Sequence, residues 1–416
     1  MSKSCEQYGL KAPVILLPNS ETEYAKWAVV ACDQYTAQPE YWETVGALVG
    51  DAPSALHIIY PEARLQEGDA RIAHINRAMD HYLAKTLTRR IEGFVLVERQ
   101  ISTGVRLGLM AAVDLEHYDY SAGSTSPIRA TEGTILERIP PRVKIRKNAH
   151  LESPHVLVLV DDPDQTLIEP LYAARDRFEP LYDFDLMMDG GHIRGWLADG
   201  KAEPGMIAAL ERLHARAKGL LYAVGDGNHS LATAKACWVA LKEKLTEEER
   251  ANHPARYALV ELNNLHDASL VFEPIHRTLA GVWAEALHGA LLAWLQGCGM
   301  GLMDASEDNA MFTLIGEKSR LPLRIEPIDR PLPLSVLQAF LDEYVGNNPG
   351  VEIDYVHGDD VAAGLAGENQ CSILLKPIDK SILFESVRKS GALPRKTFSM
   401  GEAHEKRYYL ECRAIR

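Results

Sequence analysis

Within residues 221–242 the sequence contains an apolar run that passes through a polar turn into a long helical pattern. A short apolar run followed by a helical period predicts a β-strand that leads directly into an α-helix. The turn between them consists of Gly225, Asp226, Gly227, Asn228, His229 and Ser230. Such a turn places backbone N–H groups at the positive end of a helix, where proteins bind phosphates and other anions.

The residue types in this turn suit an anion site. The two glycines permit positive φ angles and a close approach of a ligand. Asp226 can hold a magnesium ion or act as a base, while Asn228 and His229 can donate to phosphate oxygens. Ser230 can cap the helix or contact the ligand. The alternative is an ordinary tight strand–helix turn with a serine cap, and the density of polar side chains favours a site over that alternative.

A second candidate segment, residues 127–147, is the one local concentration of basic side chains. Its arginines can grip a carboxylate or phosphate in bidentate fashion, and its lysines act as point charges. The stretch 142–146 alternates charged and apolar residues, which also fits the solvated face of an edge strand, and for this stretch we favour the edge strand. The candidates that we take from the segment are Arg129, Glu132, Thr134, Arg142 and Lys144.

A third candidate segment is the basic and hydroxyl-rich stretch at residues 394–408, where Arg395 and Lys396 can contribute to an anion site. The alternative is a charged turn followed by a last strand at 408–412, and composition alone favours this alternative. The aromatic residues of the segment predict that it is docked on the fold rather than frayed.

Length and charge limit the class of protein. A chain of 416 residues is long enough for two or three domains. Its 44 basic and 58 acidic residues leave a net charge of −14, which disfavours a dedicated nucleic-acid-binding protein. The six cysteines are dispersed without a Cys-x-x-Cys pair, and the polar N-terminus has no apolar signal core. We therefore expect a cytoplasmic protein with reduced thiols and no membrane span.

Strand and helix patterns alternate along the chain, so we expect an α/β fold, with α+β as the alternative. The expected architecture is a mixed sheet core flanked by helices, at 1–280, and a smaller C-terminal α/β region, at 281–416, whose last segment docks back on the main domain. The expected helices are 21–31, 41–49, 70–86, 170–177, 205–218, 231–245, 282–294 and 334–344. The expected strands are 14–17, 93–100, 105–114, 156–160, 257–263, 353–357 and 371–377.

Several common catalytic templates are missing from the sequence. It contains no Gly-x-x-x-x-Gly-Lys-Ser/Thr phosphate loop, no Gly-x-Gly-x-x-Gly after a strand, no His-Glu-x-x-His and no Gly-x-Ser-x-Gly. The chemistry must therefore be inferred from the candidate segments themselves.

The turn at 226–230 resembles the Asp-Gly-His-His-Arg turn of a bacterial and archaeal family known as domain of unknown function 1015. Other segments resemble family segments in the family's order, namely 27–35, 128–134, 139–145, 273–277 and 394–409. The resemblance covers nearly the whole chain. The function of that family is not established, so the resemblance implies little about chemistry.

A more remote resemblance is to the group of ParB, sulfiredoxin and free serine kinase, whose Gly-x-His-Arg-type turn holds nucleotide phosphates. It implies that Asp226, Asn228 and His229 lie at the phosphates of ATP, ADP or CTP. The sequence has Asn228 in place of the first His and Ser230 in place of the Arg. The missing Arg removes a charged hydrogen bond of roughly 1.5–3 kcal/mol. Another cation must then compensate, with Arg129, Arg142, Lys396 or a magnesium ion as candidates.

These observations lead us to expect a nucleotide-dependent phosphotransferase that uses ATP or ADP with Mg²⁺. Its small-metabolite substrate is serine or phosphoserine, as the kinase resemblance implies. In this hypothesis Asp226 is the base or magnesium ligand, His229 stabilises the transferring phosphoryl group, and Glu132 orients one of the arginines that hold the anion. The alternatives are a metal-dependent phosphatase or nucleotidase and a non-enzymatic nucleotide sensor. We expect a phosphorylated small molecule as ligand and leave a homodimer open.

Overall fold

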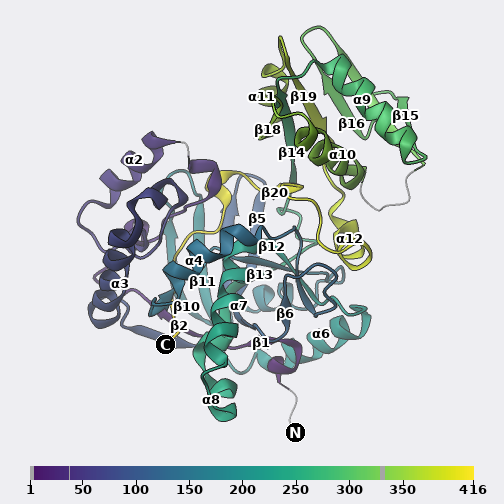
Figure 1. Ribbon diagram of the computed structural model, residues 1–416. Helices are drawn as coiled ribbons and strands as arrows, with labels where there is room; N and C mark the ends of the chain where they lie inside the picture. The colour runs from purple at the N-terminus through teal and green to yellow at the C-terminus, as the bar shows by residue number, and fades with distance from the viewer. Residues whose placement is uncertain (1–3, 37, 328–332) are drawn as a thin grey trace. The chain divides into compact units, whose positions relative to one another are not determined.

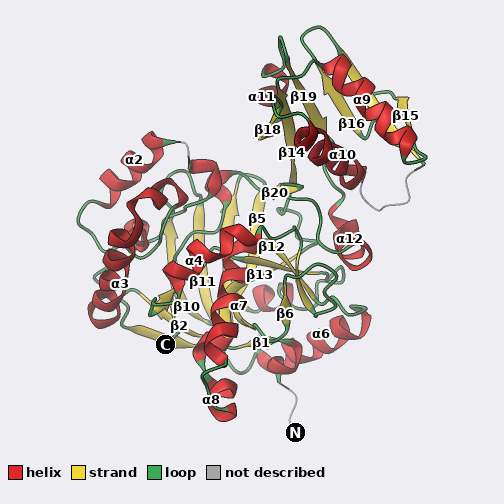
Figure 2. Cartoon of the chain, in the orientation of Figure 1, coloured by secondary structure: helices red, strands yellow, loops and turns green. Residues whose placement is uncertain are grey.

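The computed structural model describes residues 4–36, 38–327 and 333–416 (Figure 1). The chain forms two compact units, of which unit 1 comprises Met1–Val271 and Gly401–Arg416 and unit 2 comprises Phe272–Met400. Unit 2 is therefore an insertion in the sequence of unit 1. Each unit combines helices with its own sheet (Figure 2), which confirms the α/β class.

Unit 1 is built on a ten-stranded mixed sheet in the order β10-β11-β4-β5-β13-β9-β12-β7-β6, with β1 also paired to β5. The run from β10 to β13 is antiparallel, β13 is parallel to β9, and β12 is parallel to β7. The strands are β1 (Leu10–Lys11), β4 (Phe94–Ile101), β5 (Gly104–Asp114), β6 (Tyr118–Asp119), β7 (Ile128–Ala130), β9 (Leu157–Val160), β10 (Glu179–Asp185), β11 (His192–Ala198), β12 (Tyr222–Asp226) and β13 (Tyr257–Asn264).

Helices and other segments of unit 1 cover both faces of this sheet. Successive residues of a strand point to opposite faces, and on β4 Val95 and Val97 enter one hydrophobic core while Phe94 and Leu96 enter another. The two cores together leave the central strands buried on both sides. The helices of unit 1 are α1 (Tyr24–Trp27), α2 (Pro39–Val49), α3 (Gly68–Lys85), α4 (Ile139–Arg146), α5 (Glu169–Ala173), α6 (Glu203–Arg216), α7 (Asn228–Lys242) and α8 (Glu247–Asn252).

Two short strand pairs complete unit 1. β2 (Val14–Leu17) pairs with β3 (Arg89–Glu92), and β8 (Leu151–Glu152) pairs with β21 (Arg413–Ala414), both antiparallel. The pairing of β21 places the end of the chain within unit 1. Within the same unit, the Trp27 indole donates to the carbonyl of Leu410 at 2.8 Å.

Unit 2 contains a seven-stranded antiparallel sheet in the order β15-β17-β16-β19-β14-β18, with β20 also paired to β14. Leucines of α9 and α10 fill its core against the sheet. The strands are β14 (Phe272–Ala280), β15 (Gly301–Asp304), β16 (Phe312–Ile315), β17 (Arg320–Glu326), β18 (Glu352–His357), β19 (Gln370–Leu375) and β20 (Phe398–Met400). The helices are α9 (Ala284–Gly297), α10 (Pro333–Asn347), α11 (Asp359–Gly364) and α12 (Leu383–Ser390).

Most of the expected elements are observed within a few residues of their predicted bounds. The expected helices 41–49, 70–86, 205–218, 231–245, 282–294 and 334–344 are α2, α3, α6, α7, α9 and α10, and each expected strand has its counterpart. In the described part of the chain, no helix is both long enough and apolar enough to serve as a membrane span.

The helix expected at 170–177 is divided into α5 and a 3₁₀ turn at Arg175–Arg177. Three other local expectations are wrong. The helix expected at 21–31 is only α1, because the chain extends after Trp27 and Val29 pairs with Tyr409. The edge strand favoured at 142–146 is α4, whose two prolines occupy the first turn, where a missing N–H costs nothing. The last strand expected at 408–412 is reduced to two isolated bridges, at Tyr409 and Cys412.

Candidate functional site

The turn between β12 and α7 is a strand–helix junction that only glycine fits. Gly227 is the N-cap of α7, with φ 82° and ψ 25°, which is the left-handed region. A Cβ atom on Gly227 would lie 3.0 Å from Cγ2 and 3.1 Å from Cα of Val156. Because the N-cap is glycine, it offers no side chain to the first N–H groups of the helix. Ser230 lies in the first turn of α7 and is not its cap, and Gly225 lies inside β12.

The strand order brings other segments to the same edge of the sheet. β7 runs parallel to β12, so the residues that follow Ala130 lie beside the end of β12. β9 runs antiparallel to β12 with Leu157 opposite Asp226, so His155 and Val156 also reach this edge. We name the β12–α7 turn with residues 131–135, 155–156 and 406–409 the turn site.

Asp226 is held by two donors, one of which is a cation from the C-terminal segment. Its Oδ1 accepts from the backbone N–H of Gly227 at 2.8 Å, and its Oδ2 lies 3.3 Å from Nζ of Lys406. The Lys406 side chain is 9% exposed. A positive charge therefore lies at the start of α7. Lys406 was not among our candidates, and the basic character of 394–408 was its only signal.

Residues 131–135 contribute polar groups to the turn site. The Thr131 hydroxyl donates to the carbonyl of Val224 at 2.5 Å and lies 3.5 Å from Nδ2 of Asn228. The backbone N–H of Ile135 donates to Nε2 of His229 at 3.3 Å, so the neutral ring carries its proton on Nδ1. Within the described chain, Oδ1 of Asn228 and the Thr134 hydroxyl are buried atoms without a hydrogen-bond partner.

A histidine–tyrosine pair borders Asp226. Nδ1 of His155 lies 2.6 Å from the hydroxyl of Tyr409. Burial raises the pKa of Tyr409, the charges of Cys32 and Asp226 raise it further, and Arg142 opposes them. Tyr409 is therefore a neutral phenol at pH 7. A phenol and an imidazole in hydrogen-bond contact can pass a proton to and from a bound hydroxyl group.

The basic candidates of residues 127–147 are held by partners outside the turn site, whereas Glu132 belongs to the turn site. Arg129 donates to the carbonyls of Ser126, at 2.7 Å, and Gly219, at 2.8 Å, and so joins two loops. Arg142 pairs with Glu62, and Lys144 pairs with Asp69 at 2.5 Å. Glu132 is half-buried directly after Thr131.

Arg395 and Lys396 belong to unit 2. Nη2 of Arg395 lies 3.6 Å from Asp342, and its Nε donates to the hydroxyl of Tyr355 at 3.1 Å. Lys396 has a positive φ of 54°. The turn site as defined above contains residues of unit 1 alone.

Among the described residues, no group of three or more histidine, cysteine, aspartate and glutamate side chains could hold a metal ion. Asp226 is the one carboxylate of the turn that we proposed as a metal ligand. Magnesium is commonly held by one or two carboxylates together with substrate phosphates and waters. In the structure both oxygens of this carboxylate face a donor, Oδ1 the N–H of Gly227 and Oδ2 the ammonium group of Lys406.

Comparison with known proteins gives one match over most of the chain and several distant ones. No curated protein matches the sequence. Among solved structures, free serine kinase in complex with AMP is similar at 12% identity, with a TM-score of 0.38, over 70% of this chain and 91% of that chain. A conserved hypothetical protein from Pyrococcus furiosus is similar at 14% identity, with a TM-score of 0.34, over the same shares of the two chains. SbnI from Staphylococcus aureus, truncated at its C-terminus, is similar at 11% identity, with a TM-score of 0.36, over 70% and 82%.

The model of one protein family matches this sequence over the strands, loops and helix start that form most of the turn site. The match ends before Lys406, in helix α10 of unit 2. With residues 16–344 matched, the chain belongs to the family described as "Protein of unknown function (DUF1015)".

Proposed function

We propose that this protein is a nucleotide-dependent phosphotransferase that binds the phosphates of ATP or ADP at the turn site. The observation that carries the proposal is the contact between Lys406 and Asp226 at the start of α7. This contact brings a helix N-terminus, a lysine and a carboxylate together at one place. These are recurring parts of phosphoryl-transfer sites, where positioning and charge stabilisation supply nearly all of the catalysis.

Three kinds of donor support phosphate binding. The first N–H groups of α7 have no partner within the helix, and the helix dipole adds partial positive charge at this end. Lys406 supplies a full positive charge. The buried Thr134 hydroxyl, which has no partner among the described residues, is a further donor for a phosphate oxygen. Lys406 thus takes the place of the arginine that the turn lacks.

In this proposal Asp226 is the protein ligand for Mg²⁺, which when bound neutralises phosphate charge. His229 donates through Nδ1 to the transferring group. The Tyr409–His155 pair borders Asp226 and is suited to accept the proton of a substrate hydroxyl. A small hydroxy metabolite such as serine is the substrate class that this arrangement fits.

Calorimetric titration tests the binding half of the proposal. ADP is titrated into the wild-type chain, into Lys406→Met and into Lys242→Met as the control. Lys242 pairs with Glu116 near the other end of the same helix, at 2.9 Å. We expect Lys406→Met to weaken ADP binding about 10- to 100-fold, as for the loss of ~1.5–3 kcal/mol in a charged hydrogen bond. Equal affinity of Lys406→Met and the control would rule out the assigned phosphate contact.

A reaction with ATP, Mg²⁺ and serine tests the catalytic half. Transfer yields phosphoserine and ADP in equal amounts. Release of inorganic phosphate without phosphoserine would identify a hydrolase, and binding without turnover over a panel of hydroxy metabolites would identify a sensor. Either result would contradict the phosphotransferase assignment.

A further inference from the structure

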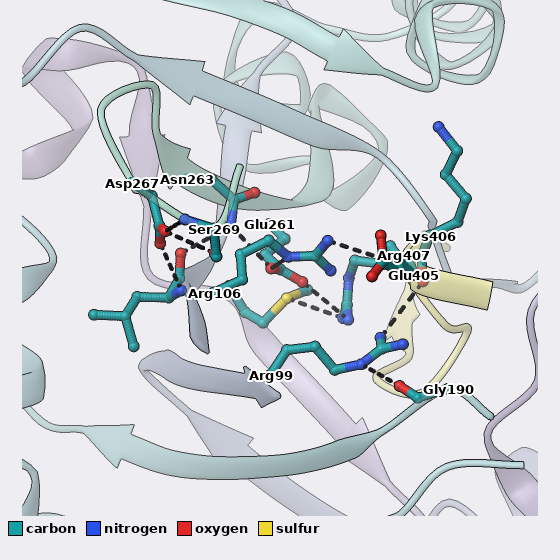
Figure 3. A network of polar contacts seen from close by, with 12 residues as sticks. Arg99, Arg106, Gly190, Glu261, Asn263, Asp267, Ser269, Glu405, Lys406 and Arg407 are labelled. Atoms are coloured by element: carbon teal, nitrogen blue, oxygen red, sulfur yellow. Dashed lines mark hydrogen bonds and ion pairs between the residues drawn. The ribbon is translucent and has the colours of Figure 1, made fainter. Parts of the chain in front are cut away.

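Two buried arginines hold the backbone that carries Lys406. Arg99 on β4 donates through Nη2 to the carbonyl of His404 at 3.0 Å and through Nη1 to that of Lys406 at 3.4 Å. Arg106 on β5 donates through Nη1 to the carbonyl of Glu405 at 3.0 Å. Three consecutive carbonyls, 404 to 406, are therefore held by two side chains that are 1% and 2% exposed. Figure 3 shows both arginines with Glu405 and Lys406.

A third contact of Arg99 fixes its own position. Its Nε donates to the carbonyl of Gly190 at 2.8 Å, in the loop between β10 and β11, and its guanidinium lies over the ring of Tyr408 at 4.8 Å from the centroid. Burial lowers the pKa of Arg99 to about 9, so the side chain remains charged at pH 7. A planar guanidinium can reach three carbonyls at once, whereas an ammonium group on a flexible stem cannot reproduce that geometry.

Carboxylates hold the segment on either side of Lys406. Glu405 accepts from the backbone N–H of Ser102 at 3.1 Å, at the turn between β4 and β5. The Arg407 guanidinium lies 3.1 Å from Glu261 on β13 and also pairs with Glu411. The Arg407 and Glu261 side chains are 1% and 2% exposed, so this pair is withdrawn from solvent.

The adjacent residues Lys406 and Arg407 therefore make contacts in two different directions. Figure 3 shows the Lys406 side chain pointing away from the Arg407 guanidinium. Arg407 enters the buried network, while Lys406 reaches Asp226 at the start of α7. Because its own carbonyl and the two before it are held, the backbone of Lys406 has little freedom to shift relative to β12.

We propose that Arg99 and Arg106 are positioning residues for anion binding at the turn site, acting through Lys406, whose backbone they fix relative to Asp226. This inference rests on the proposed function, since it assigns the phosphate contact to Lys406. It adds that the affinity for ADP depends on two strand residues that act through the backbone of residues 404–406.

A double-mutant cycle measures this dependence. ADP affinity is determined for wild type, Arg99→Lys, Lys406→Met and the double variant, and unfolding free energy is measured for each. Arg99→Lys keeps the charge but loses the multiple carbonyl contacts. We expect it to weaken ADP binding about tenfold in the wild-type background and at most about twofold in the Lys406→Met background, since residues that act as one unit are not additive. Arg106→Lys is measured in the same way and replaces it where Arg99→Lys does not fold.

Arg413→Lys is the matched control. Arg413 is a buried arginine of the same C-terminal segment, and it holds the carbonyl of Pro254 and the carboxylate of Glu152 rather than residues 404–406. We expect Arg413→Lys to lower the unfolding free energy while leaving ADP affinity unchanged.

Two results would overturn the inference, and only the first of them would also reject the proposed function. If Lys406→Met binds ADP as tightly as wild type, the proposed function fails together with the positioning role. If Lys406→Met weakens binding but Arg99→Lys and Arg106→Lys either leave the affinity unchanged or weaken it equally in both backgrounds, only the positioning role fails.

Discussion

Gly227 shows how one residue sets the geometry of the turn site. Its positive φ of 82° turns the chain from β12 into α7 within a single residue, while Asp226 stays at the end of the strand. The same residue lies against Val156, so the turn has no room for a side chain on that face. Both constraints fix the position of the first N–H groups of α7, which we assign to phosphate binding.

We expect Gly227→Ala to lower the free energy of unfolding by about 1–3 kcal/mol, the range for a non-glycine residue held in a sparsely populated backbone region. Gly205→Ala is the control, because Gly205 lies in α6 with nothing within 4 Å of its Cβ position. Alanine there is expected to stabilise the chain by up to ~1 kcal/mol. Urea unfolding measures both, and equal stability of Gly227→Ala and wild type would contradict the strained-turn account.

For individual residues, the sequence indicated the β12–α7 turn but not the lysine that contacts it. The polar turn after an apolar run was recognisable because its residues are adjacent in the chain. Lys406 was not predicted, since its contact with Asp226 depends on how the C-terminal segment threads through unit 1. The Glu62 partner of Arg142 is equally non-local, and no pattern in the chain indicates it.

The C-terminal segment of unit 1 shows how an element with almost no regular secondary structure is held. The regular structure of residues 401–416 consists of a short 3₁₀ turn, two isolated β-bridges, at Tyr409 and Cys412, and the strand β21. Their anchors are buried ion pairs, such as Arg407 with Glu261. Burial alone would raise the pKa of Glu261, but the charges of Arg407 and Arg106 outweigh it, so the pKa is lowered.

This lowered pKa predicts how stability depends on pH. The native state binds protons at Glu261 less readily than the unfolded chain, so its contribution is fully present above the ordinary pKa of 4.5 and is lost as the pH falls through the native value. Glu261→Gln is expected to be ~3–5 kcal/mol less stable at pH 7, as for a broken buried pair, and to lose part of the acid dependence. Exposed Glu243→Gln is the control. Urea titrations from pH 7 to 3 check this, and an acid slope in Glu261→Gln equal to that of wild type would refute it.

Hydrophobic periodicity allowed long helices to be predicted from the sequence, whereas pairings between distant segments could not be predicted. Helix α7 was predictable because its apolar positions repeat with a helical period over many residues. Helix α1 ends early because Val29 pairs with Tyr409, a partner from the far end of the chain. α4 was mistaken for a strand because its charged residues alternate, although Pro140 and Pro141 favour a helix start.

The whole molecule is organised by the insertion of unit 2 into unit 1. Phe272 and Met400, at the two ends of the insertion, are register partners in the antiparallel pair β14–β20. The chain therefore leaves unit 1 and returns to it at neighbouring positions. From the sequence we expected the last segment to dock back on the main domain, but not the pairing of Phe272 with Met400, because the entire second unit separates these two residues.

We expect unit 1 to fold when residues 272–400 are replaced by a short glycine–serine linker, since directly paired residues of antiparallel strands lie only about 4.5–5.5 Å apart. The shortened chain should unfold cooperatively and bind ADP in a manner that depends on Lys406. Circular dichroism and calorimetry measure these properties. Loss of cooperative unfolding would show that unit 1 needs unit 2 to fold, and a folded chain without ADP binding would contradict the assignment of the phosphate contact to unit 1.

In the proposed function, phosphate groups bind at the start of α7 beside Lys406. The most direct test is an NMR titration of the ¹⁵N-labelled chain with ADP, which follows the backbone amide signals of Asn228, His229 and Ser230. We expect these amides to show the largest shifts and Lys406→Met to abolish the shifts at the same ADP concentration. Binding of ADP that leaves these three amides unchanged while signals elsewhere move would contradict this expectation.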